Sequence, residues 1–132
     1  MSIHFNHTIV ACHDATASAR FWADMLGLEI GAQYGPFLPV TVDNGVTFDF
    51  ALDSPVVGEI PTMHYAFLVS EEDFDAGFAR IQELGLRYWA DPHGQHEGEI
   101  NHNDGGRGVY FRDPNGHALE FLTVPYGGWP ES

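Results

Sequence analysis

Four residues with side chains able to bind a metal ion lie in short apolar segments of this sequence: His7, Asp49, His64 and Glu120. Two imidazoles with one or two carboxylates suit Fe(II), Mn, Ni, Co or Zn and leave coordination positions open for a substrate. Taken singly, a strand histidine or carboxylate is usually an ordinary core or surface residue. The metal-site interpretation therefore depends on whether the fold places all four residues at matching positions on its strands.

The sequence contains two similar halves that would supply such positions. His7 and His64, 57 residues apart, each open an apolar, strand-like run that is followed by a helical pattern ending at Leu-Gly-Leu. Later in each half, a turn sequence with Asn-Gly is followed four residues on by Asp49 or Glu120. These acids are 71 residues apart, so the second half carries an insertion, which we place in residues 91–106.

Each half is predicted to form a strand, a helix and three further strands. Asp14 is a suitable cap for the first helix and Gly27 a suitable stop, and its expected apolar stripe contains Ala17, Phe21 and either Met25 or Leu28, joined by Trp22. The predicted helices span residues 15–26 and 72–84. The predicted strands span residues 3–12, 29–34, 38–42 and 46–52 in the first half, and 63–69, 86–90, 108–112 and 118–124 in the second.

The length of 132 residues fits one compact α+β domain. Within residues 1–132 we expect module one at about 1–53, a linker at about 54–61, module two at about 62–124 and an irregular tail at 125–132.

Strand alternation places the four candidate ligands on the face opposite the helices, because successive side chains of a strand point to opposite sides. In the first strand this assignment depends on the repeat. Buried ionisable groups are costly unless they are paired or bound to metal, so four matching positions favour a metal site. The residues expected to face the helices are Phe48, Phe50, Leu52, Tyr65, Phe67, Val69, Leu119, Phe121 and Thr123.

Composition excludes several classes of partner. Five Lys and Arg against nineteen Asp and Glu give a net charge of −14, which repels nucleic acid and anionic lipid surfaces. No segment approaches the roughly 20 apolar residues that a membrane span needs. Cys12 is the only cysteine, which excludes an internal disulfide and fits a cytoplasmic protein. We expect a small-molecule substrate as the partner.

Two stretches resemble the vicinal oxygen chelate superfamily, which includes glyoxalase I, fosfomycin-resistance proteins, extradiol dioxygenases and bleomycin-resistance proteins. Residues 109–121, VYFRDPNGHALEF, are similar to its closing pattern, an aromatic residue before DPxGHxLE. The resemblance covers nearly the whole chain. The residues similar to its opening pattern are His7, Asp14, Ser18, Phe21, Trp22, Leu26, Gly27 and Leu28.

The resemblance implies two tandem βαβββ modules that form a curved mixed sheet around a metal cleft, with His7, His64 and Glu120 as ligands. Asp49 occupies the fourth ligand position, but it is one methylene shorter than the expected glutamate, so a direct bond and a water-mediated contact are the alternatives. The candidates for a general base are Glu120, Asp49 and a loop histidine, and Glu120 is the one that we expect to be catalytic. Tyr110 is implied as a substrate-contacting catalytic residue, with core packing as the alternative.

The family resemblance leaves two classes of function. The first is a divalent-metal-dependent enzyme of the glyoxalase or dioxygenase type, a lyase, isomerase or dioxygenase, whose small substrate chelates the metal through oxygens. The second is a non-catalytic binder of the bleomycin-resistance type. Fosfomycin thiol transfer is disfavoured because the chain has no lysine. A homodimer is expected, with the cleft formed either within one chain or across two.

The inserted segment, residues 91–106, is rich in histidine, glutamate and glycine. A second metal site is one interpretation, but the ligand spacing matches no tight set, so a solvated loop is favoured. The third interpretation is a lid that lends His102 or Arg107 to the substrate.

Overall fold

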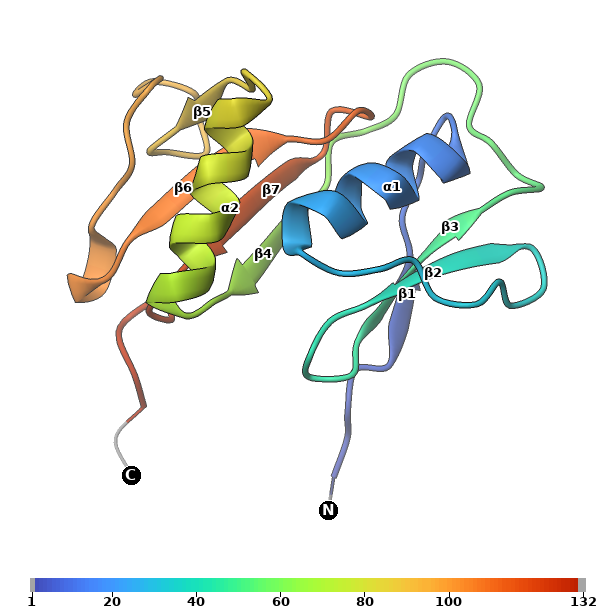
Figure 1. Ribbon diagram of the computed structural model, residues 1–132, viewed down its shortest axis with the longest axis horizontal. Coiled ribbons are helices and arrows are strands. Elements are labelled where there is room, and N and C mark those ends of the chain that lie inside the picture. The colour runs from blue at the N-terminus through green and yellow to red at the C-terminus, as the bar shows by residue number, and fades with distance from the viewer. Residues whose placement is uncertain (1, 131–132) are drawn as a thin grey trace. The chain divides into compact units, whose positions relative to one another are not determined.

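The computed structural model describes residues 2–130. The chain divides after Pro61 into two compact units, and in each of them one long helix covers a small mixed sheet (Figure 1). The α+β class is therefore confirmed, whereas the expectation of a single domain over residues 1–132 stays a prediction. Among the described residues, no helix has the length and apolar character needed to cross a membrane.

The first unit consists of four elements, and its sheet has the order β1-β3-β2. Strand β1 runs parallel to β3, and β2 runs antiparallel to β3. The elements are β1 (His7–Ile9), α1 (Ala15–Leu26), β2 (Phe37–Thr41) and β3 (Thr47–Ala51).

The prediction of a strand at residues 29–34 is wrong, because the structure has no strand there. This segment makes an isolated bridge between Tyr34 and Phe37 and one backbone bond from Gly31 N–H to Pro39 O. Paired residues of an antiparallel ladder exchange two bonds, but Pro39 has no N–H to donate back. The ladder along this side of β2 is therefore interrupted where a further strand would pair.

The second unit has a four-stranded sheet of order β4-β7-β6-β5. Its first pair, β4 and β7, is parallel, and the other pairs are antiparallel. Strand β5 is shorter than predicted, and a 3₁₀ turn lies within the inserted segment. The elements are β4 (His64–Leu68), α2 (Glu71–Glu83), β5 (Tyr88–Trp89), η1 (Asn103–Gly105), β6 (Gly108–Arg112) and β7 (Ala118–Leu122).

The helix ends follow the expected capping chemistry. Asp14 accepts a hydrogen bond from Ala17 N–H at 3.0 Å, and Gly27 ends α1 in the left-handed conformation at φ 68°. Helix α2 begins one residue earlier than predicted, at Glu71, because Ser70 caps it by accepting from Asp73 N–H at 3.0 Å.

The apolar stripe predicted for α1 is partly wrong. Ala17 is exposed and Phe21 is only partly buried. The ring of Trp22 lies 5.1 Å from that of Phe48 and 5.4 Å from that of Phe50, and this large buried side chain sets the rotation of the helix. The residues of α1 that are buried are Ala15, Ser18, Ala19, Trp22, Ala23 and Met25.

The predicted alternation of strand faces is confirmed for most of the residues expected to face the helices, whereas Tyr65 and Val69 are only partly buried. Phe48, Phe50, Phe67 and the matching residues of β7 are buried. Leu52 is 40% exposed because β3 ends one residue earlier, at Ala51, where the alternation stops. The face opposite each helix therefore carries the candidate ligands, as the sequence predicts.

Close packing between α2 and β7 leads to our first testable prediction. A Cβ added at Gly77 would lie 2.6 Å from Cε2 of Phe121, which neighbours Glu120 on β7. Overpacking costs about 1–3 kcal/mol, more than the roughly 1 kcal/mol that alanine gains over glycine in a helix. We expect Gly77→Ala to lower the free energy of unfolding in urea, whereas Gln82→Ala, at an exposed position of α2, leaves it unchanged or slightly higher. Equal stability of the two variants would contradict this packing.

Candidate metal centre

Glu120 is the centre of a polar cluster in the second unit. It lies in the middle of β7, paired with Ala66 of β4 on one side and Tyr110 of β6 on the other. Its carboxylate is almost completely buried, with the residue 1% exposed. His64, two residues before Ala66 on β4, places Nε2 2.8 Å from Oε1 of Glu120.

Two tyrosine hydroxyls complete this cluster. The hydroxyl of Tyr126 donates to Glu120, with Oη 2.7 Å from Oε1 and 2.8 Å from Oε2. The hydroxyl of Tyr110 lies 3.0 Å from that of Tyr126, and the Tyr110 ring lies 5.7 Å from the His64 ring. Tyr110 is itself buried. Its burial agrees with the core-packing alternative, and contact of its hydroxyl with a substrate stays a prediction.

The hydroxyls of Tyr110 and Tyr126 stay protonated at neutral pH and can therefore donate hydrogen bonds. Burial raises the pKa of Tyr126, and its hydrogen bonds with Tyr110 and Glu120 raise it further. Burial also raises the pKa of Tyr110, and the negative charge of Glu120 acts in the same direction. Both hydroxyls thus keep their protons throughout the physiological range.

The donor atoms of His64 and Glu120 fit a divalent ion. Metal bonds to histidine nitrogen and carboxylate oxygen are about 2.0–2.2 Å long, so two ligands of one ion lie about 3.0 Å apart at right angles and about 3.4 Å apart at the tetrahedral angle. The observed 2.8 Å between Nε2 and Oε1 is a hydrogen-bond distance, so these atoms would have to separate by only a few tenths of an ångström to hold an ion. An imidazole and a buried carboxylate are also ligands that Fe(II), Mn, Ni, Co and Zn accept.

His7 and Asp49 occupy the corresponding positions of the first unit. In the parallel pair β1 and β3, Ile9 is opposite Asp49, just as Ala66 is opposite Glu120. His7 precedes Ile9 by two residues, as His64 precedes Ala66. His7 is exposed, and its Nδ1 lies 2.7 Å from Asn6 Oδ1.

The two units differ in the residue that the antiparallel neighbour strand places opposite the carboxylate. Asp49 faces Pro39 across β2 and β3, where Glu120 faces Tyr110 across β6 and β7. The first unit therefore repeats the positions of the ligands but carries no hydroxyl opposite Asp49.

Each unit supplies one histidine and one carboxylate. Within the described part of either unit, taken by itself, no three His, Cys, Asp or Glu side chains gather closely enough to hold a metal ion. The four-residue set His7, Asp49, His64 and Glu120 thus requires contributions from two units, and its assembly stays a prediction.

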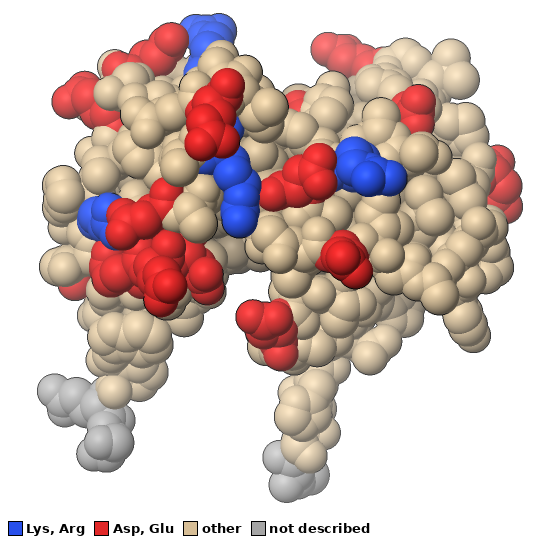
Figure 2. All heavy atoms as spheres, in the orientation of Figure 1, with Lys and Arg blue, Asp and Glu red and all other residues tan. Residues whose placement is uncertain are grey.

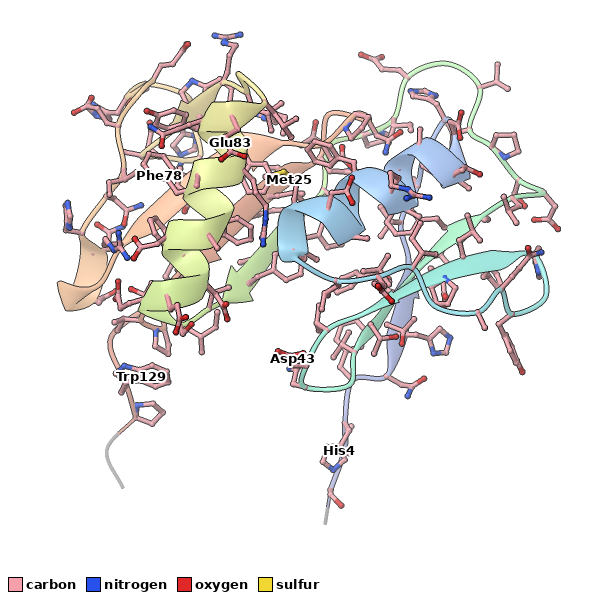
Figure 3. All side chains as sticks on the ribbon, viewed as in Figure 1. His4, Met25, Asp43, Phe78, Glu83 and Trp129 are labelled. Carbon is pink, nitrogen blue, oxygen red and sulfur yellow. The ribbon has the colours of Figure 1, made fainter. Side chains whose placement is uncertain are left out.

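Tyr126 is the site residue that the sequence did not indicate. We expected residues 125–132 to form an irregular tail, and residues 125–130 contain turns and no helix or strand, while residues 131–132 lie outside the described part. The tail that carries Trp129 continues beyond β7 (Figure 3). A tyrosine between Pro125 and Gly127 was the available clue, because such a turn can redirect a side chain toward the preceding strand.

The inserted segment is tied down by its own hydrogen bonds. Asp91 accepts from the backbone N–H groups of Gln95 and His96, and the Asn101 amide donates to Ala90 O at 2.8 Å. These bonds are typical of a structured loop, and no cluster of metal ligands forms among its described residues. The second metal site weighed from the sequence therefore lacks support.

Arg107 binds α2 in this structure. Its guanidinium pairs with Glu71 at 2.7 Å and Asp75 at 2.8 Å, and lies 4.4 Å from the ring centroid of Phe74. Hydrogen bonds to these two carboxylates raise the pKa of Arg107. Acidic side chains gather over the start of α2 (Figure 2), where Glu71 belongs to the first turn. The role of substrate contact considered for Arg107 is therefore not supported.

Comparison with known proteins identifies the family. The chain matches the model of the Glyoxalase/Bleomycin resistance protein/Dioxygenase superfamily over residues 4–121. It is 32% identical over 118 residues to the glutathione transferase FosA of Serratia marcescens, covering 87% of this chain and 77% of that protein. A metallothiol transferase FosB of Shouchella clausii is 38% identical over 60 residues, covering 46% of this chain and 37% of that protein.

Solved structures agree with this result. The structure of oxidase ChaP-H2 has a TM-score of 0.92 and 62% sequence identity, covering 97% of this chain and 98% of that chain. The superfamily resemblance stated from the closing motif is thus confirmed. The chain belongs to the glyoxalase/bleomycin resistance protein/dioxygenase superfamily.

Proposed function

We propose that this protein is a divalent-metal-dependent oxidase or dioxygenase that acts on a small substrate through two adjacent oxygens. The observation that carries this proposal is the 62% identity, over 97% of the chain, with a protein named an oxidase. The buried Glu120 carboxylate beside His64 supports it, because an imidazole next to a carboxylate is a donor set that first-row divalent metals accept. We further propose a cytoplasmic homodimer.

His7, His64 and Glu120 are the proposed ligands, with Asp49 as a fourth ligand or as the acceptor of a metal-bound water. When bound, such an ion would supply Lewis acidity toward the substrate oxygens and, in the case of Fe(II), redox reactivity toward dioxygen. The support for this set is the matching strand register of the two units.

Side chains of the second unit would orient the substrate and exchange protons or hydrogen bonds with it. The hydroxyl of Tyr110 gives its proton to the Tyr126 hydroxyl at 3.0 Å, since Tyr126 itself donates to Glu120, so it would accept a hydrogen bond from a substrate hydroxyl beside Glu120. A carboxylate that is not fully used by the ion is a suitable base for a substrate hydroxyl, and Glu120 is the proposed catalytic base. Burial of Glu120 limits the access of water to this proton transfer.

The charge pattern favours a substrate without a phosphate or phosphonate group. Arg87 pairs with Glu97, and Arg107 pairs with Glu71 and Asp75. Arg112 donates to Gly116 O. These cations of the second unit are engaged by the protein itself, and the chain has no lysine to add. A neutral vicinal diol, catechol or hydroxyquinone fits this environment better than an anionic drug.

Dioxygen consumption tests the proposed reaction. The full-length protein, loaded anaerobically with Fe(II), is mixed with a panel of catechols and hydroxyquinones in an oxygen-electrode cell. We expect oxygen uptake and substrate oxidation with Fe(II), and none with Zn(II) in the same site, because Zn(II) has no redox chemistry.

Two outcomes would replace the proposal by another function. Glutathione-dependent addition to an epoxide without oxygen uptake would identify a thiol transferase, in line with the similarity to FosA. Tight binding of a ligand without stoichiometric metal would identify a binding protein of the bleomycin-resistance type.

A further inference from the structure

Tyr126 connects the tail to the most buried carboxylate of the second unit. Its hydroxyl contacts both oxygens of Glu120, although the residue itself is 63% exposed. An exposed ring with its hydroxyl on a buried carboxylate indicates a specific contact, since burial of the ring does not hold it there.

The backbone around Tyr126 is shaped to make this contact. Gly127 and Gly128 follow it at φ 81° and φ 91°, a conformation that other residues rarely adopt. Gly128 N–H donates to Pro125 O at 2.8 Å, which closes a tight turn. The side chain of Asp104, in the inserted segment, accepts from Gly127 N–H at 3.1 Å. The insertion thus anchors the turn that presents the Tyr126 hydroxyl.

The two oxygens of Glu120 have different surroundings. Oε1 lies 2.8 Å from His64 Nε2 and 2.7 Å from the Tyr126 hydroxyl, whereas Oε2 lies 2.8 Å from that hydroxyl. A single O–H proton divided between two oxygens makes a weaker bond with each than a linear bond with one. Were Oε1 to hold an ion together with His64, the O–H of Tyr126 could turn fully to Oε2, so the contact would persist and strengthen.

We infer that Tyr126 is a positioning residue, which fixes the Glu120 carboxylate so that a single oxygen is presented to the metal ion. The inference rests on the proposed metal site. Hydrogen bonds to a ligating carboxylate orient it, and their loss typically lowers metal affinity by about 10–100-fold. Asp104 contributes indirectly, by holding the turn on which Tyr126 stands.

Cobalt(II) titration of the full-length protein tests this role. Isothermal titration calorimetry gives the affinity, and the d–d absorption spectrum of bound cobalt reports the coordination number. We expect Tyr126→Phe to weaken Co(II) binding by about 10–100-fold and to lower the d–d absorption, because a released carboxylate can bind through both oxygens. Asp104→Ala should shift both measurements in the same direction by less, and Asp104→Asn, which keeps an acceptor for Gly127 N–H, should restore them.

Control measurements distinguish a failure of the role inferred for Tyr126 from a failure of the proposed metal site. Tyr34→Phe removes the hydroxyl of an exposed tyrosine in the first unit and should match the wild type. Thermal unfolding without metal checks that Tyr126→Phe is folded. Unchanged affinity and spectrum for Tyr126→Phe would overturn the inference, and so would tighter binding, which would make Tyr126 a competitor of the ion. If the wild type binds no stoichiometric Co(II), the metal site fails, whatever Tyr126 does.

Discussion

Glu120→Gln is expected to weaken binding of Fe(II) or Co(II) by more than about 100-fold, beyond the 10–100-fold typical for loss of an outer partner. The amide has nearly the same shape and its oxygen still accepts from Tyr126, but the charge and one donor oxygen are lost. Calorimetric titration measures the affinity, and elemental analysis of the dialysed protein measures the metal content. Oxidase activity should disappear in parallel.

A second carboxylate in the same unit provides the control for Glu120→Gln. Glu99 lies in the inserted segment with its side chain 65% exposed, so Glu99→Gln removes the same net charge without touching the site. It should bind metal as the wild type does. Metal affinity that is equally reduced in both variants would mean that the acidic surface attracts the ion, and an unaffected Glu120→Gln protein would remove Glu120 from the ligand set.

Mixed dimers of two inactive variants are expected to recover half of the wild-type metal content. If the cleft combines the first unit of one chain with the second unit of its partner, a heterodimer of His7→Ala and Glu120→Gln contains one site with both changes and one site with neither. Two-fold symmetry therefore predicts about one intact site in two. The heterodimer is isolated with two different affinity tags, and its metal is measured by elemental analysis.

The matched control for this experiment places both changes in the second unit. A heterodimer of His64→Ala and Glu120→Gln has one change in each site, so it should hold no tightly bound metal. Metal-free His7→Ala/Glu120→Gln heterodimers would instead place His7, His64 and Glu120 of one chain around one ion. Recovery in both heterodimers would contradict both arrangements.

The repeat explains why so much of the fold is predictable from the sequence. Asp14 and Gly27 carry capping chemistry that depends on their nearest neighbours alone, and α1 begins and ends where they indicate. The pairs Ile9 with Asp49 and Ala66 with Glu120 follow from equal spacing and strand alternation. Helix ends and strand pairs of this kind can therefore be predicted from the sequence, because local or periodic interactions determine them.

The remaining features depend on contacts between distant segments. The interrupted ladder beside β2 follows from the missing N–H of Pro39 opposite Gly31, a pairing that periodicity does not reveal. The rotation of α1 follows from the packing of Trp22. Tyr126 reaches Glu120 from a turn that Asp104, 23 residues before Gly127, holds through the Gly127 N–H. These contacts join segments that are distant in the sequence, so no local sequence pattern predicts them.

The proline on the outer strand of the first sheet also bears on aggregation. Strand β2 lies at the end of the order β1-β3-β2, where an unpaired edge would be a template for strands of other molecules, and the backbone of Gly31 and Tyr34 covers part of this edge by bonding to Pro39 and Phe37. Pro39 removes one further donor from that edge. We therefore expect the residue that interrupts the ladder beside β2 also to disfavour pairing of this edge with strands of other molecules.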